Sequence, residues 1–420
     1  MGNSLPSHNH GRMIGYKLKV QELNRNDTSD FGSSFSGVTM SGKNLATWHE
    51  SGYGKVRIWD ITPAGKVVSR TSIKSPHVTH DRATFGCSLV MDGDFLGVGS
   101  YYTWRSNPHD GRFYVYDWKK NRKVSDFNPS PRSAQYFGMH SSISEDVVCV
   151  TQGGASHANW RVPAAYTFYI RNGLDLNQVY RFAHPGNASH ASHVVSKGDY
   201  FASYVYAPFD SPHKYYLYLW KVQRDPAGIP VGVKVVDTIS TNNLDTDPIR
   251  GPMAFGENIL FIGNSDGYVG MFKINSNDQL EYAGKLKPAQ PAQAKGFGSS
   301  VLHYEDYLLV GAPKAANSTP GTGKVFIFKD LGSGKYEEEV TFYPASLKSG
   351  ETFGDKIMGA ENTLAIRGGS KLVYFYQIDR EIVPSQTSNP AKIVEPFIVW
   401  EKKFDNTIND VIPTAGDAWM

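Results

Sequence analysis

Short apolar segments alternate with turn residues along most of the chain. The clearest phrase is an acidic or amide residue followed by an apolar run that ends near glycine, as at residues 94–99 and 306–311. The turn residue of this phrase recurs at positions 44, 94, 146, 199, 258, 306 and 362, with spacings between 48 and 59 residues. Recurrence at such a period is typical of repeat architectures, including propellers.

An aromatic segment with a period of two follows each copy of the first phrase. Its seven copies are residues 56–61, 113–118, 166–170, 215–220, 268–272, 325–328 and 372–376. Such alternation predicts β-strands with one buried face. A third phrase, Phe-Gly, precedes several copies, at residues 31–32 (shifted), 85–86, 137–138, 297–298 and 353–354.

Seven units of about 53 residues predict an all-β fold, a seven-bladed β-propeller of four-stranded blades. Residues 15–23 precede the first unit and have the pattern of an outer strand, so we expect them to complete the last blade and close the ring. The predicted organisation is a polar N-terminal arm at 1–14, the propeller at 15–377, and a C-terminal extension or docked tail at 378–420.

The Phe-Gly phrase followed by Val-Gly-Ala-Pro resembles the FG-GAP repeats of integrin α-subunit propellers and related propeller lectins. The best match is residues 297–328, where Phe297-Gly298 precedes Gly311-Ala312-Pro313. The family's calcium loops, Asp-x-Asp-x-Asp-Gly, are not matched, and the nearest fragments have too few ligands for calcium. The resemblance therefore implies a propeller that recognises glycans or proteins without bound calcium.

Composition narrows the class of protein. The chain has 420 residues, 41 glycines and 13% aromatic residues, which suits β-strands joined by turns and disfavours a helical bundle. A net charge of +3 without a basic block predicts no nucleic-acid partner. Cys87 and Cys149 are too few for a disulfide framework and predict buried free thiols.

The chain has no apolar run of about 18 residues, so we expect no membrane insertion. The polar N-terminus lacks the apolar core of a signal peptide. These features leave the localisation open between cytoplasmic, particle-borne and mature secreted.

Propeller topology assigns the connecting loops to two faces. Loops between the second and third strands of each blade share one face with the loops between blades, which we expect near residues 68–84, 120–136, 176–192 and 236–250. On this face, blades 2 to 4 carry the candidate ligand-binding residues Tyr102, Trp104, Arg105, His109, His157, Trp160, Arg161, Tyr206 and His213. Aromatic rings stack on sugar faces, and Arg and His bind hydroxyls or carboxylates.

The sequence has no Gly-x-Ser-x-Gly, His-Glu-x-x-His or phosphate-loop motif, and no cofactor is predicted. We therefore predict a non-enzymatic recognition or attachment protein that binds a glycan or a protein surface. One alternative is a carbohydrate-active lyase or hydrolase that uses His157, Arg161 and Tyr206 at the propeller mouth. Another is a structural component of a larger assembly, such as a virion or surface particle.

Two other interpretations concern single residues. Each loop ring, taken alone, also suits packing beneath a neighbouring loop. His77 with His80, and His190 with His193, have the spacing of ligand pairs. Zinc needs three or four ligands, so no metal site is predicted.

Overall fold

The structure is a computed structural model of the 420-residue chain. It describes residues 15–383 apart from the segments 28–37, 50–53, 63–66, 77–83, 104–109, 129–135, 154–155, 158–159, 162–163, 186–189, 208–213, 241–250, 265–266, 316–321, 333, 345–346, 348–349, 361–362 and 369–371. The expected arm at 1–14 lies outside the described residues. The expected C-terminal extension at 378–420 begins too early, because residues 378–383 continue the third strand of the last blade, and the rest of it lies outside the described residues.

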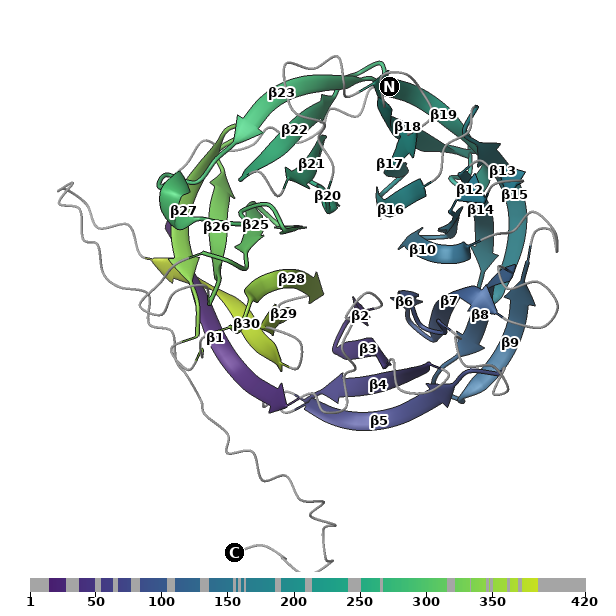
Figure 1. The fold of residues 1–420 in the computed structure, drawn as a ribbon, viewed down its shortest axis with the longest axis horizontal. Coiled ribbons are helices and arrows are strands. Elements are labelled where there is room, and N and C mark those ends of the chain that lie inside the picture. Colours follow the sequence, from purple (N-terminus) through teal and green to yellow (C-terminus); the bar gives the residue numbers. More distant parts are fainter. Residues whose placement is uncertain are drawn as a thin grey trace, which may run out of the picture.

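The described residues form seven four-stranded antiparallel sheets arranged around a central axis (Figure 1). Blades 1 to 4 are β2 (Val38–Ser41), β3 (Asn44–His49), β4 (Lys55–Ile61), β5 (Val67–Lys74); β6 (Ser88–Asp92), β7 (Phe95–Thr103), β8 (Asp110–Asp117), β9 (Arg122–Phe127); β10 (Phe137–Ser144), β11 (Val147–Gln152), β14 (Ala165–Asn172), β15 (Asp175–Ala183); and β16 (His190–Lys197), β17 (Tyr200–Ala207), β18 (Lys214–Arg224), β19 (Pro230–Ser240). Blades 5 to 7 are β20 (Met253–Phe255), β21 (Ile259–Asn264), β22 (Tyr268–Ile274), β23 (Leu280–Leu286); β24 (Ser300–Tyr304), β25 (Tyr307–Ala312), β26 (Lys324–Asp330), β27 (Tyr336–Phe342); and β28 (Phe353–Ala360), β29 (Thr363–Gly368), β30 (Leu372–Val383), β1 (Gly15–Asp27). The predicted seven-bladed propeller is confirmed.

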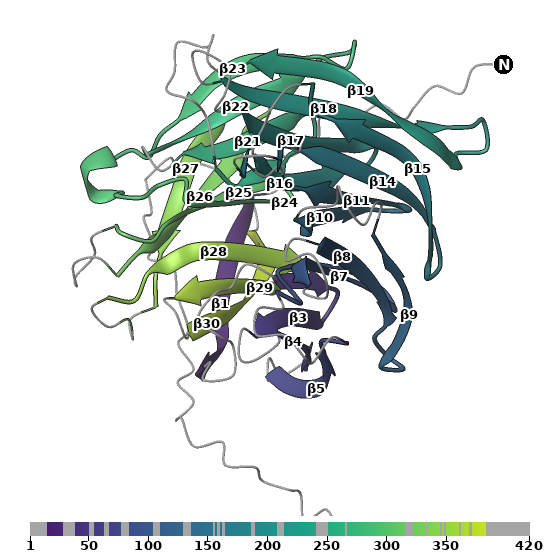
Figure 2. The ribbon, with the colours of Figure 1, turned by 45° about the vertical axis from the view of Figure 1, so that its right-hand side comes forward.

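The last blade takes its outer strand from the start of the chain. β1 pairs antiparallel with β30, from Gly15 opposite Val383 to Asp27 opposite Leu372. In Figures 1 and 2, β1 runs alongside β30 and meets the first blade at the seam of the ring. The expected closing strand at residues 15–23 is therefore present, and it extends to Asp27.

The core lies between blades. One cluster joins Ile58 of blade 1 to Leu96 and Trp118 of blade 2, and another joins Trp59 of blade 1 to Phe375 of blade 7. Every residue of β11, β21 and β25 is buried, because a second strand is covered by a neighbouring blade on each face. This burial explains why the first sequence phrase is a continuous apolar run.

In blades 2, 3, 6 and 7, the Phe-Gly phrase packs the blade against the one before it. Phe85, Phe137, Phe297 and Phe353 are fully buried, and the glycines that follow them all have positive φ. Phe297 packs edge-on against Phe326 of its own blade at 5.2 Å. A Cβ on Gly298 would lie 2.7 Å from the Tyr268 carbonyl oxygen of the preceding blade. The phenylalanine thus fills its own blade, and the glycine permits close contact with the previous one.

The expected loops between blades begin too early along the chain. Outer strands β5, β9, β15 and β19 occupy the first part of each of the four predicted loop segments. These strands lie at the rim with one face toward solvent, so their pattern is more polar than that of the inner strands. The same polarity also favours a loop, which explains the error.

Candidate functional site

The two faces of the propeller differ in loop length. Connections between the first and second strands of a blade span two or three residues, from β2–β3 through β28–β29. Connections between blades span six to thirteen residues, and the second-to-third-strand connections of blades 3 and 6 span twelve and eleven. We call the face with these longer connections the long-loop face. Long loops on a rigid scaffold are the usual place for binding residues.

Blade 3 carries an extra element on this face. Between β11 and β14, the chain forms a small hairpin of β12 (Ser156–His157) and β13 (Trp160–Arg161), in which His157 pairs with Trp160 and Ser156 with Arg161. The hairpin brings three of the predicted site residues, His157, Trp160 and Arg161, onto one two-stranded element. The sequence placed them in one loop without indicating this pairing.

Tyr206 lies near the long-loop end of β17 in blade 4. Its ring stacks on that of Tyr215 in β18, with centroids 4.7 Å apart and planes at 25°. Tyr206 is half-buried and Tyr215 is buried. Tyr215 therefore holds the Tyr206 ring in place while leaving part of it accessible.

His184 follows β15 on the same face, but it packs inside the protein. Its Nδ1 lies 2.5 Å from the Tyr218 hydroxyl, and its ring lies 5.0 Å from that of Tyr216. Only 4% of His184 is exposed. This histidine, expected in a loop between blades, orders the boundary of blades 3 and 4 rather than facing solvent.

The structure brings together only some of the predicted site residues. His157, Trp160 and Arg161 share the blade 3 hairpin, and Tyr206 lies in the adjacent blade 4. Tyr102 lies near the end of β7 in blade 2. Trp104, Arg105, His109 and His213 lie outside the described residues. His77 and His80, which have the spacing of a metal-ligand pair, also lie outside the described residues.

A second set of polar residues lies at the propeller axis. His140 of β10 and His193 of β16 have ring centroids 4.3 Å apart. Burial first, then the charges of His193 and Lys356, hold the pKa of His140 well below its usual range. Burial and the charge of Lys356 lower the pKa of His193 to about 4. Both imidazoles are therefore neutral at pH 7.

Lys356 belongs to β28, which faces β10 and β16 across the centre of the ring in Figure 1. Burial and the charge of Arg367 lower its pKa to about 8, although Asp355 acts in the opposite direction. Asp355 is itself paired with Arg367 at 3.2 Å. We call His140, His193 and Lys356 the axial cluster.

The axial cluster was not predicted as a site from the sequence. The available signal was the Phe-Gly phrase: His140 and Lys356 each lie two residues after the glycine of that phrase, in blades 3 and 7. Aligning the repeats on this glycine would have put both residues at the same level of the first strand. It would not have shown that they act on one another, because blades 3 and 7 are far apart in sequence.

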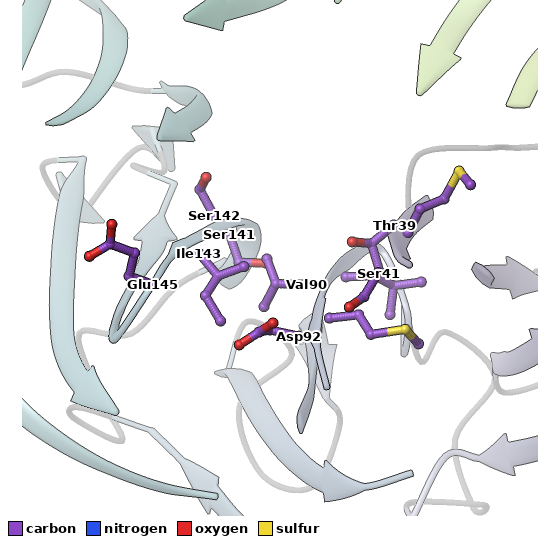
Figure 3. Close-up of a pocket in the computed structure, with 11 residues that line it drawn as sticks. Thr39, Ser41, Val90, Asp92, Ser141, Ser142, Ile143 and Glu145 are labelled. Atoms are coloured by element: carbon purple, nitrogen blue, oxygen red, sulfur yellow. The ribbon is translucent and has the colours of Figure 1, made fainter. Parts of the chain in front are cut away.

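A cavity of about 440 Å³ lies between blades 1, 2 and 3 and reaches the turns between their first and second strands (Figure 3). Asp92 and Glu145 lie at this cavity. Arg171 pairs with Asp92, and Arg224 pairs with Glu145 at 2.6 Å. These carboxylates thus join neighbouring blades, and the short turns around them present no binding loops.

The described residues offer no metal centre and no activated thiol. They contain no group of three or more His, Cys, Asp or Glu side chains arranged to hold a metal ion. Cys87 and Cys149 are free and buried, and burial raises the pKa of Cys87 to about 12 and that of Cys149 well above its usual range. Both thiols therefore stay protonated and unreactive. No helix within the described ranges has the length and hydropathy needed to cross a membrane.

Comparison with known proteins identifies the fold alone. No family model matches the chain, and no curated protein matches it. Among solved structures, a chain of the mitotic checkpoint complex is similar, with a TM-score of 0.52 at 12% identity over 90% of this chain and 99% of that chain. The computationally designed Ika8 protein has a TM-score of 0.48 at 11% identity, over 85% of this chain and 99% of that chain. The seven four-stranded sheets around one axis define the class of the protein, the seven-bladed β-propeller.

Proposed function

We propose that the protein is a non-enzymatic recognition protein whose long-loop face binds a glycan or a protein surface. The observation that carries this proposal is the difference between the faces. Short turns close one face, whereas long connections, the extra β12–β13 hairpin and the Tyr206–Tyr215 stack all belong to the other.

The chemistry of the blade 3 and blade 4 loops suits a glycan. A tyrosine ring held by a buried partner offers a fixed flat surface for a sugar, at little cost in side-chain entropy. The hairpin adds an indole, a guanidinium and an imidazole, groups that can stack on a sugar or bind its hydroxyls and carboxylates. The closed ring of blades provides a rigid platform for both elements.

A glycan array with the purified chain tests this proposal, with Trp160→Ala and Tyr206→Ala as the key variants. We expect each substitution to weaken binding by about tenfold or more, as loss of an aromatic hot-spot residue does. Tyr282→Ala is the matched control, because Tyr282 lies on the outer strand β23 and is 36% exposed.

Equal loss in all three variants would indicate a general folding defect, which melting curves detect. Glycan binding that neither loop variant weakens would refute the proposed face. If no glycan on the array is bound, the same variants and the wild type are compared for the proteins that they capture in pull-downs from the native source. A partner captured equally by wild type and both loop variants would overturn the proposal.

We also propose that the repeats are of the FG-GAP type, which is a more specific class than the propeller fold. The support is the repeated contact between blades. Gly311 lies against the Gly354 carbonyl of the next blade, and the Ser300 hydroxyl donates a hydrogen bond to that carbonyl at 2.6 Å. Gly99, Ser88 and Gly138 repeat this arrangement between blades 2 and 3, where the bond is 2.9 Å.

A further inference from the structure

The axial cluster stands at irregularities of the innermost strands. The register of β10 against β11 shifts between Phe137 and Ser141, that of β16 against β17 between Ala191 and Val194, and that of β28 against β29 between Phe353 and Ile357. His140, His193 and Lys356 each lie inside one of these shifts. A bulge redirects side chains away from the regular alternation of a strand. Three blades thus depart from regular pairing at the residues that carry the basic groups.

The cluster lies on β10, β16 and β28, the innermost strands of their blades (Figure 1). His193 is exposed, and His140 and Lys356 are half-buried, yet protein surrounds all three closely enough to dominate their protonation. Cavities of about 440 and 590 Å³ continue along the inner strands and share Ser142 and Ile143, which follow His140 on β10. The exposure of His193 and the partial exposure of His140 and Lys356 make the axial cluster accessible to small solutes.

The local charge balance is positive. The groups that act on the cluster are His140 on β10, His193 on β16, Asp355 and Lys356 on β28, and Arg367 on β29. Among the described residues that act on the cluster, Asp355 is the only carboxylate, and its ion pair with Arg367 offsets its charge. The ammonium group of Lys356 and the N–H groups of the two imidazoles can donate hydrogen bonds to an oxyanion.

We propose that the axial cluster of His140, His193 and Lys356 binds a small oxyanion, which is a sulfate, a phosphate or the acidic group of a sugar. An anion here would favour the charged form of Lys356 and of the imidazoles, so its binding takes up protons. This site is separate from the long-loop residues and does not depend on the proposed recognition function.

The direct probe is sulfate, because its charge stays constant from pH 6 to 9. Isothermal titration of the full chain should show saturable binding, with an association constant that falls by about tenfold per pH unit above pH 8 as Lys356 loses its proton. Lys356→Gln should weaken binding by at least about tenfold, as expected for loss of a charged hydrogen-bond donor. Lys356→Arg should retain it.

Lys197→Gln is the matched control, because Lys197 is an exposed lysine on an inner strand at the second cavity, outside the axial cluster. It should bind sulfate as wild type does. An affinity that Lys356→Gln leaves unchanged, or a wild type that shows no saturable binding, would overturn the proposal. Because no glycan is used, this outcome is independent of the glycan array.

A second measurement needs no variant. In NMR spectra of the wild type, sulfate should shift the imidazole signals of His140 and His193 and raise both pKa values, while His184 stays unchanged. Unchanged signals for the two axial histidines would count against the site. Displacement of sulfate by glucuronate but not by glucose would assign the anion to an acidic sugar, whereas displacement by phosphate alone would assign it to a free inorganic anion.

Discussion

Single glycines determine how closely the blades approach one another. Gly354 has φ +87°, and a Cβ there would lie 2.7 Å from the Lys324 carbonyl oxygen of blade 6. Gly350 has nearly the same φ, +86°, but a Cβ there would meet nothing within 4 Å. The two positions therefore separate backbone strain from crowding between blades.

We expect Gly350→Ala to lower the free energy of unfolding by about 1–3 kcal/mol through strain at positive φ alone. Gly354→Ala should cost a further 1–3 kcal/mol or so, because the added methyl group is forced against a fixed backbone. Urea unfolding of both variants measures the difference. Equal losses would mean that blades 6 and 7 can separate slightly at no cost.

At the scale of elements, ring closure depends on one strand from the start of the chain. β1 covers the whole length of β30, and without it β30 would present an unpaired edge. Closure of this kind is what removes the exposed edges of a propeller.

A chain that begins at residue 28 lacks β1, whereas a chain that begins at residue 15 retains it. We expect the shorter chain to melt at a lower temperature and to aggregate as its concentration rises, because β30 can pair with a second copy. The longer chain should melt like the full protein. Calorimetry and light scattering measure both effects, and a shorter chain that stays monomeric with an unchanged melting temperature would contradict this account.

At the scale of the whole molecule, inner-strand histidines couple stability to pH. Burial and then the charge of Lys197 lower the pKa of His303 to about 4, although Asp330 and Asp306 act in the opposite direction. The pKa values of His140 and His193 are lowered as well. The unfolded chain binds these protons more readily than the folded protein does. The free energy of unfolding is therefore undiminished by each histidine above about pH 6.5 and decreases as pH falls toward 4.

The melting temperature should therefore begin to fall below pH 6.5, before the carboxyls of Asp117, Asp126 and Asp278, whose pKa values are lowered, add to the loss from about pH 5 downward. His303→Gln should make this fall shallower by removing one of the three groups. A series of melting curves in non-coordinating buffers tests this expectation. A flat profile in that window would show that the three imidazoles take up protons freely in the folded state.

The sequence predicted the propeller because its repeats are regular. Each blade buries a continuous apolar strand and an alternating aromatic strand, so both appear directly in the order of residues. The outer strands were less clear, since β9 and β15 pair on one side only and carry mostly polar residues. The hairpin β12–β13 was predicted only as part of a loop, because two-residue strands carry no periodic signal.

The chain by itself determined the number of blades and the closing strand, because both depend on local pattern and repeat length. Only the tertiary structure decided which polar residues meet. His140, His193 and Lys356 come from blades 3, 4 and 7, and the closed ring places them at one axis. Tyr206, predicted in a loop, lies in β17 and stacks on its cross-strand neighbour Tyr215 within the same blade. The meeting of residues from three blades arises from closure of the ring, which sequence spacing alone does not encode.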